Sequence, residues 1–578
     1  MSSSIDIHQV FADYFDEKLI RKIAYECSSK LSDGHICVDI DEYNKTHDEL
    51  ISEKELLESK WVTNLSDTPN VFVIQNKKIY LHRYFSYETE IVEGIHQLIA
   101  HEHLSDRKNQ LVEKKELIRQ LFHQQELEGN WQLVAAVMSY LHNFSIITGG
   151  PGTGKTTTIV RLLALAYTIN PDIKVALVAP TGKAAMRIKE TILASKLQIG
   201  NLLETKVLES FDKIHSSTIH RLLGYKQGTH YFKHDIDNPL DYDLVIVDES
   251  SMIGVSLMAK LIRAIPSDKQ LIFLGDKNQL ASVEAGSVFS DICQSLSQIN
   301  CFSQDHLDFI NQFSDYTFNQ DYLLGKSNIL SEHIVELQKS YRFDIDKGIG
   351  RLSRAILQGT FMLQDIDKYA SDGEVQFFTD YKVEHFESFY NLYRTYISEK
   401  DTLKALQEFA KIRLLSPTHK GKYSVDYFNV EIERYLRQSG LLFPKAGFYH
   451  NQPIMITKND YQLKLFNGDI GLIRENNDGE LQAYFEAEDG GLRAINPNFI
   501  GQYRTVFAMT IHKSQGSEFD QVAMVLPKEE IAILSKELLY TGLTRAKTNL
   551  WIFSNPSILE VSSQKPVQRA SGIADRLL

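Results

Sequence analysis

The segment "SIITGGPGTGKTTTIVRL" (145–162) decides the fold. A short apolar run leads into a glycine-rich loop, a lysine with three threonines, and a second apolar run. This order predicts a strand, a phosphate-binding loop and a helix. Residues 149–156 fit the pattern G-x4-G-K-[ST], whose backbone N–H groups attract phosphate oxygens. The segment therefore predicts an ATP site in which Lys155 reaches the β- and γ-phosphates and the Thr156 hydroxyl holds Mg²⁺.

The composition is that of a globular protein with several domains. A chain of 578 residues exceeds what one hydrophobic core can organise. Its net charge of −13 excludes a protein held on nucleic acid by a global positive field, so any such role needs basic groups gathered in a groove.

The compartment is expected to be the cytoplasm. The N-terminal stretch is acidic where a secretory signal needs positive charge, and no apolar run approaches the roughly 18 residues that span a membrane. The four cysteines have no metal-binding spacing and are expected to be reduced.

Two sets of β-branched strands alternate with helical stretches and predict an α/β protein with two parallel sheets. The first set is "FSIIT", "KVALVA", "DLVIVDE" and "QLIFLGD", within a domain at 121–350. The second set is "IRLLSP", "TVFAMTIH", "QVAMVLP" and "NLWIFS", within a domain at 351–578. Short strands and turn signals at 447–500 predict a small β-barrel inserted into the second domain.

Residues 1–120 form the remaining predicted domain, which reads as mostly helical. Apolar residues recur at helical spacing in "SEKELLESKW" and "RKNQLVEKKELIRQLF", while 70–85 indicates a hairpin that turns at Asn76-Lys77. Its acidic surface fits either contact with a protein partner or simple solvation.

An acidic pair supplies the second half of the nucleotide site. Asp248 and Glu249 end an apolar strand, where a parallel sheet places its ligand-facing residues. We expect Asp248 to anchor Mg²⁺ and Glu249 to polarise the attacking water. A lone Asp-Glu pair could instead cap a helix, but the phosphate loop upstream favours hydrolysis. Gln279, after a further strand, could sense the γ-phosphate or orient water, and this signal is weak by itself.

Eight motifs together resemble superfamily 1 helicases, and most closely the RecD family, the alpha subunits of bacterial exonuclease V (RecBCD). They cover most of residues 130–555: "GGPGTGKTTT", "APTGKAA", "STIHRLLG", "VIVDESSM", "GDKNQLASVEAG", "KSYRF", "MTIHKSQGSEFD" and "YTGLTRAK". The resemblance implies two RecA-like domains with an SH3-like barrel insertion. It also implies an ATP-dependent 5′-to-3′ DNA helicase that processes double-strand breaks beside RecB- and RecC-type subunits, one of which carries the nuclease.

The same resemblance assigns roles around the nucleotide. Gln132 would read the adenine edge and Tyr341 would stack on adenine. Arg342 and Arg545 would reach the γ-phosphate from the second domain, although an arginine taken alone is more often a surface ion-pair partner. Gln132 alone could be an exposed helix residue. The remaining nucleotide-contacting positions are Gly149, Gly150, Pro151, Gly152, Thr153, Gly154, Thr157, Gly516 and Glu518.

The resemblance to this family also implies a binding path for single-stranded DNA. Small polar side chains and backbone amides suit phosphate contacts that ignore base sequence. The matching positions are Pro180, Thr181, Gly182, Lys183, Thr218, His220, Thr510, His512 and Lys513. His512 alone could equally be a structural histidine. Residues 224–243 could form a strand-separating pin or an irregular linker, and 302–332 read as an insertion without an assigned role.

Two other functions are compatible with part of these motifs. A stand-alone 5′-to-3′ helicase often has a longer N-terminal region with helix-hairpin-helix repeats, which 1–125 do not show. A non-motor scaffold switched by nucleotide could dispense with the catalytic carboxylate and arginines, so the full set of motifs argues against it.

Overall fold

The computed structural model describes residues 6–64, 70–123, 129–226, 228–229, 231–444, 447–460, 462–487 and 490–577. The chain divides into two compact units. The first unit contains residues 1–277, 281–339 and 568–578, and the second contains 278–280 and 340–567. Among the described helices, none combines the length and apolar character needed to cross a membrane.

The N-terminal part of the first unit has its own small core. Helices α1 (Ile7–Ala12), α2 (Lys18–Ser32), α3 (Ile40–Thr46) and α4 (Glu53–Leu57) pack on a sheet of order β1-β4-β3-β2. Its strands are β1 (Cys37–Asp39), β2 (Val62–Thr63), β3 (Phe72–Gln75) and β4 (Lys78–Leu81). The hairpin turn predicted at Asn76-Lys77 is confirmed, and both residues have the positive φ that a tight two-residue turn requires.

A six-stranded parallel sheet forms the centre of the first unit, with strand order β10-β5-β9-β8-β6-β7. The four predicted strands are confirmed as β5 (Phe144–Gly149), β6 (Val175–Ala179), β8 (Leu244–Val247) and β9 (Gln270–Gly275). Sequence patterns did not reveal β7 (His215–Thr218) or β10 (Ile334–Leu337), which form the two edges. The sequence of β7, "HSST", contains no apolar run of the kind that predicts a buried strand.

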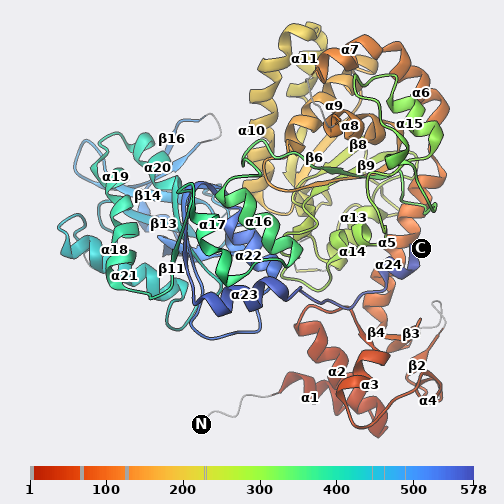
Figure 1. Cartoon of the computed structure of the whole chain (residues 1–578), viewed down its shortest axis with the longest axis horizontal. Coiled ribbons are helices and arrows are strands. Elements are labelled where there is room, and N and C mark those ends of the chain that lie inside the picture. Colours follow the sequence, from red (N-terminus) through yellow and green to blue (C-terminus); the bar gives the residue numbers. More distant parts are fainter. Residues whose placement is uncertain are drawn as a thin grey trace. The chain divides into compact units, whose positions relative to one another are not determined.

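Successive strand residues face two separate hydrophobic cores, as a sheet covered on both faces requires. Ile146, Val178 and Phe273 point into the core beneath α5 (His82–Ala100), α13 (Val255–Arg263) and α14 (Val288–Gln294). Ile147 and Leu177 point into the other core. The second core is covered by α6 (Leu104–Glu113), α7 (Lys115–Leu121), α8 (Trp131–Leu141), α9 (Lys155–Ile169), α10 (Gly182–Ile199), α11 (Thr205–Asp212) and α15 (Gln304–Ile310) (Figure 1).

The second unit repeats the parallel α/β design with strand order β11-β20-β19-β12-β18. The predicted strands are β12 (Ile412–Ser416), β18 (Ala508–Thr510), β19 (Phe519–Val525) and β20 (Ala546–Phe553), and β11 (Val375–Phe378) is added at the edge. The helices of this unit are α16 (Gly348–Gln358), α17 (Ile366–Ala370), α18 (Val383–Tyr390), α19 (Arg394–Ser398), α20 (Thr402–Ala410), α21 (Val425–Gln438), α22 (Lys536–Leu543) and α23 (Pro556–Gln564). Two RecA-like sheets are therefore confirmed.

An antiparallel sheet interrupts the second unit where short strands were predicted. Its order is β16-β15-β14-β13-β17, and Ile454, Ile473 and Phe485 belong to its separate core. The strands are β13 (Gln452–Ile456), β14 (Ile470–Glu475), β15 (Leu481–Glu486), β16 (Leu492–Ile495) and β17 (Tyr503–Thr505).

The C-terminal segment leaves the second unit and ends in the first. Helix α24 (Ile573–Arg576) packs against α14 and α5. The Arg569 guanidinium donates hydrogen bonds to the carbonyls of Ser282 (2.8 Å), Glu284 (3.1 Å) and Gly286 (2.9 Å). The last residues therefore complete the first unit.

Candidate functional site

The glycine-rich loop joins β5 to α9 at the carboxyl edge of the first sheet. Gly152 and Gly154 have positive φ angles of 79° and 86°, which let the loop turn tightly into the helix. The Lys155 ammonium donates to the carbonyls of Gly149 (2.6 Å) and Gly150 (3.1 Å). The loop thus holds its lysine beside a helix N-terminus, an arrangement suited to phosphate.

Gln132 is buried against this loop and is not an exposed helix residue, so that alternative is wrong. It lies in the first turn of α8, its side-chain amide donates to the Thr153 carbonyl at 3.2 Å, and Arg161 donates to its oxygen at 2.8 Å. A Cβ on Gly154 would lie 2.1 Å from the Gln132 amide nitrogen. Sequence reasoning missed Arg161, which lies two turns into α9 and orients the glutamine.

Asp248 and Glu249 follow β8 at the same edge of the sheet. The Asp248 amide donates to the Val178 carbonyl at 2.8 Å, and Glu249 adopts a left-handed φ of 52°. Burial and the neighbouring Glu249 charge raise the pKa of Asp248, while the charges of Lys155 and Arg187 oppose that rise. The acidic pair therefore lies within electrostatic reach of the loop lysine. Arg187, on α10, was not singled out from the sequence.

Gln279 belongs to a three-residue segment that is part of the second unit. Next to it, the Leu280 amide donates to the Thr541 hydroxyl at 2.9 Å, and Gln515 donates to the Leu280 carbonyl at 2.9 Å. The segment that follows β9 is thus anchored to two motifs of the second unit.

Three motifs far apart in sequence converge within the second unit. Arg342 forms an ion pair with Glu518 at 2.5 Å. The buried Arg545 donates to the carbonyls of Thr541 (3.0 Å) and Ser517 (3.2 Å). Both predicted arginines therefore lie at one place, beside the loop that contains Gly516, whose φ is +70°. Tyr341, the predicted adenine-stacking residue, is 50% exposed.

The predicted DNA-contacting residues of the first unit lie where two neighbouring strands end. Pro180 to Lys183 follow β6, and Thr218 ends the adjacent β7. The hydroxyls of Thr181 and Thr218 accept hydrogen bonds from the N–H groups of Ala184 (3.2 Å) and Arg221 (3.3 Å), so they cap helices α10 and α12 (Ile219–Leu222). Two helix N-termini thus meet at one edge. The pKa of His220, on α12, is lowered by burial.

The corresponding residues of the second unit follow β18. The buried Thr510 accepts a hydrogen bond from the Lys513 amide at 3.2 Å, and His512 and Lys513 begin a short 3-10 helix (His512–Ser514). Thr510 and Lys513 line a cavity of about 340 Å³ together with His419 and Arg504. Burial and the Arg504 charge lower the pKa of Lys513. His419 and Arg504 are additions that sequence motifs did not indicate.

The predicted pin is described only in part, because Gln227, half of its predicted turn, and His230 lie outside the described residues. Tyr225 and Phe232 form a single antiparallel bridge, and Tyr231 is exposed.

The insertion at 302–332 packs on the first unit. Helix α15 and Phe318 belong to the core beneath α8, and the Phe318 ring meets the Trp131 ring edge-on, with 5.2 Å between the ring centres. This insertion therefore supports the helix that carries Gln132.

Comparisons with known proteins agree with these motifs. Residues 132–285 match the AAA domain family, and residues 505–553 match the UvrD-like helicase C-terminal domain. The chain is 34% identical over 543 residues to the RecBCD enzyme subunit RecD of Haemophilus influenzae, covering 86% of this chain and 80% of that protein. It is 29% identical over 596 residues to the subunit of the same name from Buchnera aphidicola subsp. Schizaphis graminum, covering 95% of each.

A second kind of relative matches over a smaller share of its length. The ATP-dependent RecD2 DNA helicase of Deinococcus radiodurans is 26% identical over 435 residues, which cover 75% of this chain and 50% of that protein. The similarity thus extends along 80% and 95% of the two RecBCD enzyme subunits but along 50% of this helicase.

Proposed function

Because the chain belongs to the RecD family of RecBCD enzyme subunits, we propose that it is the 5′-to-3′ motor of a heterotrimer that processes double-strand breaks in the cytoplasm. The chain is an ATP-dependent DNA helicase. RecB- and RecC-type proteins are the proposed partners, and one of them is expected to carry the nuclease.

The observation that carries this proposal is the placement of the phosphate loop and the acidic pair on one sheet edge. The loop follows β5 and the pair follows β8, and the strands are parallel. Lys155 would exchange the carbonyls of Gly149 and Gly150 for phosphate oxygens. Glu249 would accept a hydrogen bond from the attacking water.

Mg²⁺ is the proposed metal, and the donor set fits it. The Thr156 hydroxyl and the Asp248 carboxylate are hard oxygen donors, which Mg²⁺ prefers while it keeps several water ligands. The raised pKa of Asp248 reflects burial and the adjacent Glu249 charge, both of which a divalent cation would offset. When bound, the metal would neutralise charge that develops on the phosphates.

The second unit is proposed to supply cationic groups to the same reaction. Arg545 is buried and held by two carbonyls, so its guanidinium has little freedom. Arg342 is held by Glu518, a contact that phosphate could replace. Groups that arrive only when the units close would couple hydrolysis to movement.

DNA is proposed to bind at the strand ends that carry Thr181, Thr218 and Thr510. Helix N-termini and small hydroxyls contact phosphates without reading base sequence. Such contacts are few and weak, so a chain with a net charge of −13 can hold DNA while it steps.

The proposal is tested by ATP hydrolysis and by unwinding of duplexes with a single-stranded tail, using the chain alone and co-expressed with its partners. We expect single strands to accelerate hydrolysis and only 5′-tailed duplexes to open. Lys155→Gln should abolish both activities and leave the complex assembled, because the Lys155 ammonium donates its two hydrogen bonds to carbonyls of its own loop. Unwinding restricted to 3′ tails, or hydrolysis indifferent to DNA, would contradict the proposal.

A further inference from the structure

Three ionisable side chains gather at the sheet edge opposite the phosphate loop. His142 lies just before β5, His333 lies just before β10, and Glu102 follows α5. Because β5 and β10 are parallel neighbours, both histidines stand where the strands begin. The nucleotide loop begins at the other end of β5, so this cluster is separate from the site already described.

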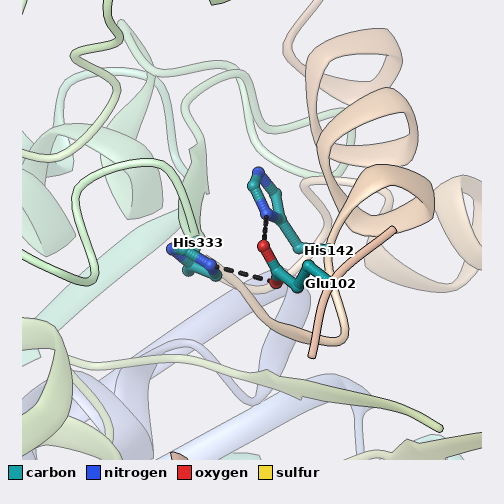
Figure 2. Close-up of side chains that lie close together, drawn as sticks. All are labelled: Glu102, His142 and His333. Atoms are coloured by element: carbon teal, nitrogen blue, oxygen red, sulfur yellow. Dashed lines mark hydrogen bonds and ion pairs between the residues drawn. The ribbon is translucent and has the colours of Figure 1, made fainter. Parts of the chain in front are cut away.

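Figure 2 shows both imidazole rings directed at the single Glu102 carboxylate. His142 Nδ1 lies 2.9 Å from Oε2, and His333 Nε2 lies 3.2 Å from Oε1. The three ligand atoms all lie within 4.8 Å of one another. Two ligands bonded to one tetrahedral zinc ion at about 2.0–2.1 Å stand about 3.3 Å apart, which is close to both observed separations.

The cluster is enclosed by the protein, and the Asn143 amide also donates to Glu102 Oε1 at 2.9 Å. The exposed fraction of the side chains is 6% for Glu102, 2% for His142 and 7% for His333. His142 Nε2 and His333 Nδ1 are buried without a hydrogen-bond partner among the described residues. These two nitrogens belong to the far sides of the rings, so His142 Nδ1 and His333 Nε2 are the ring nitrogens that face the shared carboxylate. One buried carboxylate thus faces two imidazole nitrogens, which together form a mixed donor set of oxygen and nitrogen.

We propose that Glu102, His142 and His333 bind one divalent transition-metal ion of the zinc class, which fastens the end of α5 to the starts of β5 and β10. Two imidazoles and one carboxylate favour zinc over Mg²⁺ or Ca²⁺, which prefer all-oxygen sites. Its position away from the phosphate loop assigns it a structural role. The proposal does not depend on the helicase function.

The test measures metal in tag-free, full-length protein produced in zinc-supplemented medium and purified without chelator. Mass spectrometry of the metal content should give about one zinc per chain. Adding zinc to protein stripped by a chelator should raise its thermal midpoint. Cobalt in place of zinc should show the absorption bands of a four-coordinate ion.

His306→Gln is the matched control. His306 is also a buried histidine paired with a carboxylate, Glu332, at 2.7 Å, and its ring lies 5.8 Å from that of His142. His333→Gln and Glu102→Gln should lose the zinc and the thermal shift, whereas His306→Gln should keep both. Wild-type protein that is folded yet substoichiometric in zinc and shows no cobalt bands overturns the proposal. Zinc retained by Glu102→Gln but lost by His306→Gln overturns the ligand set.

Discussion

Gly154 ends the phosphate loop at the start of α9 and packs against Gln132 of α8, the helix that precedes the loop. Its φ of +86° is readily adopted only by glycine, and a Cβ at this position would lie 2.1 Å from the Gln132 amide nitrogen, so any side chain would force Gln132 to move. The loop conformation and the position of Gln132 are therefore mutually dependent. The contact between Gly154 and Gln132 joins residues that are far apart in the chain, so no local sequence pattern reveals it.

Gly154→Ala should weaken ATP binding at least about tenfold, because the added methyl group must displace Gln132 as well as strain the backbone. Equilibrium binding of a fluorescent ATP analogue measures this. Gly359→Ala is the control: its φ is +65°, but a Cβ there meets nothing within 4 Å. Equal affinity in the two variants would contradict the proposed contact.

Glu249 is a non-glycine residue with φ of +52°, a strained conformation of the kind that proteins retain where function requires it. Glu249→Gln should lower kcat for DNA-stimulated ATP hydrolysis by about 10²- to 10⁴-fold and preserve ATP binding, since only the proton acceptor is lost. Steady-state kinetics and nucleotide binding measure the two effects. Glu209→Gln, the same change at an exposed position of α11, should alter neither. A Glu249 variant with normal kcat would remove this residue from the reaction.

Individual elements formed where the local pattern was strong. The apolar runs became buried parallel strands, but β7 and β10 were missed because polar side chains replace or interrupt their short apolar runs. The helical stretch at 107–122 divides into α6 and α7 around Lys114, whose φ of −102° and ψ of 17° are not helical. In these segments, packing against the rest of the sheet and the neighbouring helices determines the secondary structure more than local propensity does.

The insertion at 302–332 supports the nucleotide site through Phe318, which is buried against Trp131. Phe318→Ala should destabilise the first unit by about 3–5 kcal/mol and raise KM for ATP, because α8 positions Gln132. Thermal unfolding and steady-state kinetics are the measurements. Phe443→Ala removes an exposed ring and should change neither. An unchanged KM in a destabilised Phe318 variant would show that the insertion only adds stability.

At the scale of the molecule, the C-terminal segment closes the first unit with a buried polar network. Ser571 and the Gly572 amide donate to Glu88 at 3.1 and 2.9 Å, and Asp291 on α14 lies nearby with one carboxylate oxygen that has no partner among the described residues. Burial raises the pKa of Asp291 to about 7. The fold thus prefers this carboxyl in its neutral form.

This preference makes stability depend on pH. Since the folded pKa of Asp291 lies above its unfolded value of 3.8, the folded state binds the proton more tightly and stability is lost as pH rises from about 4 through 7. Asp291→Asn should therefore stabilise the first unit at pH 8 by about 1–3 kcal/mol and by less at pH 5. Thermal midpoints at both pH values test this. Asp237→Asn, at an exposed site, should shift neither midpoint, and an equal gain at both pH values for Asp291→Asn would contradict the titration.

The sequence by itself determined the two α/β sheets, the phosphate loop and the acidic pair, because each depends on residues that are neighbours in the chain. Periodicity indicates whether a segment forms a helix or a strand, and a glycine-rich turn between strand and helix requires no distant partner. Tertiary structure alone decided that Gln132 is buried on the loop, that Arg342 pairs with Glu518, and that Glu102 holds two histidines. Those contacts depend on strand order and helix packing, which bring together segments far apart along the chain and which no local pattern encodes.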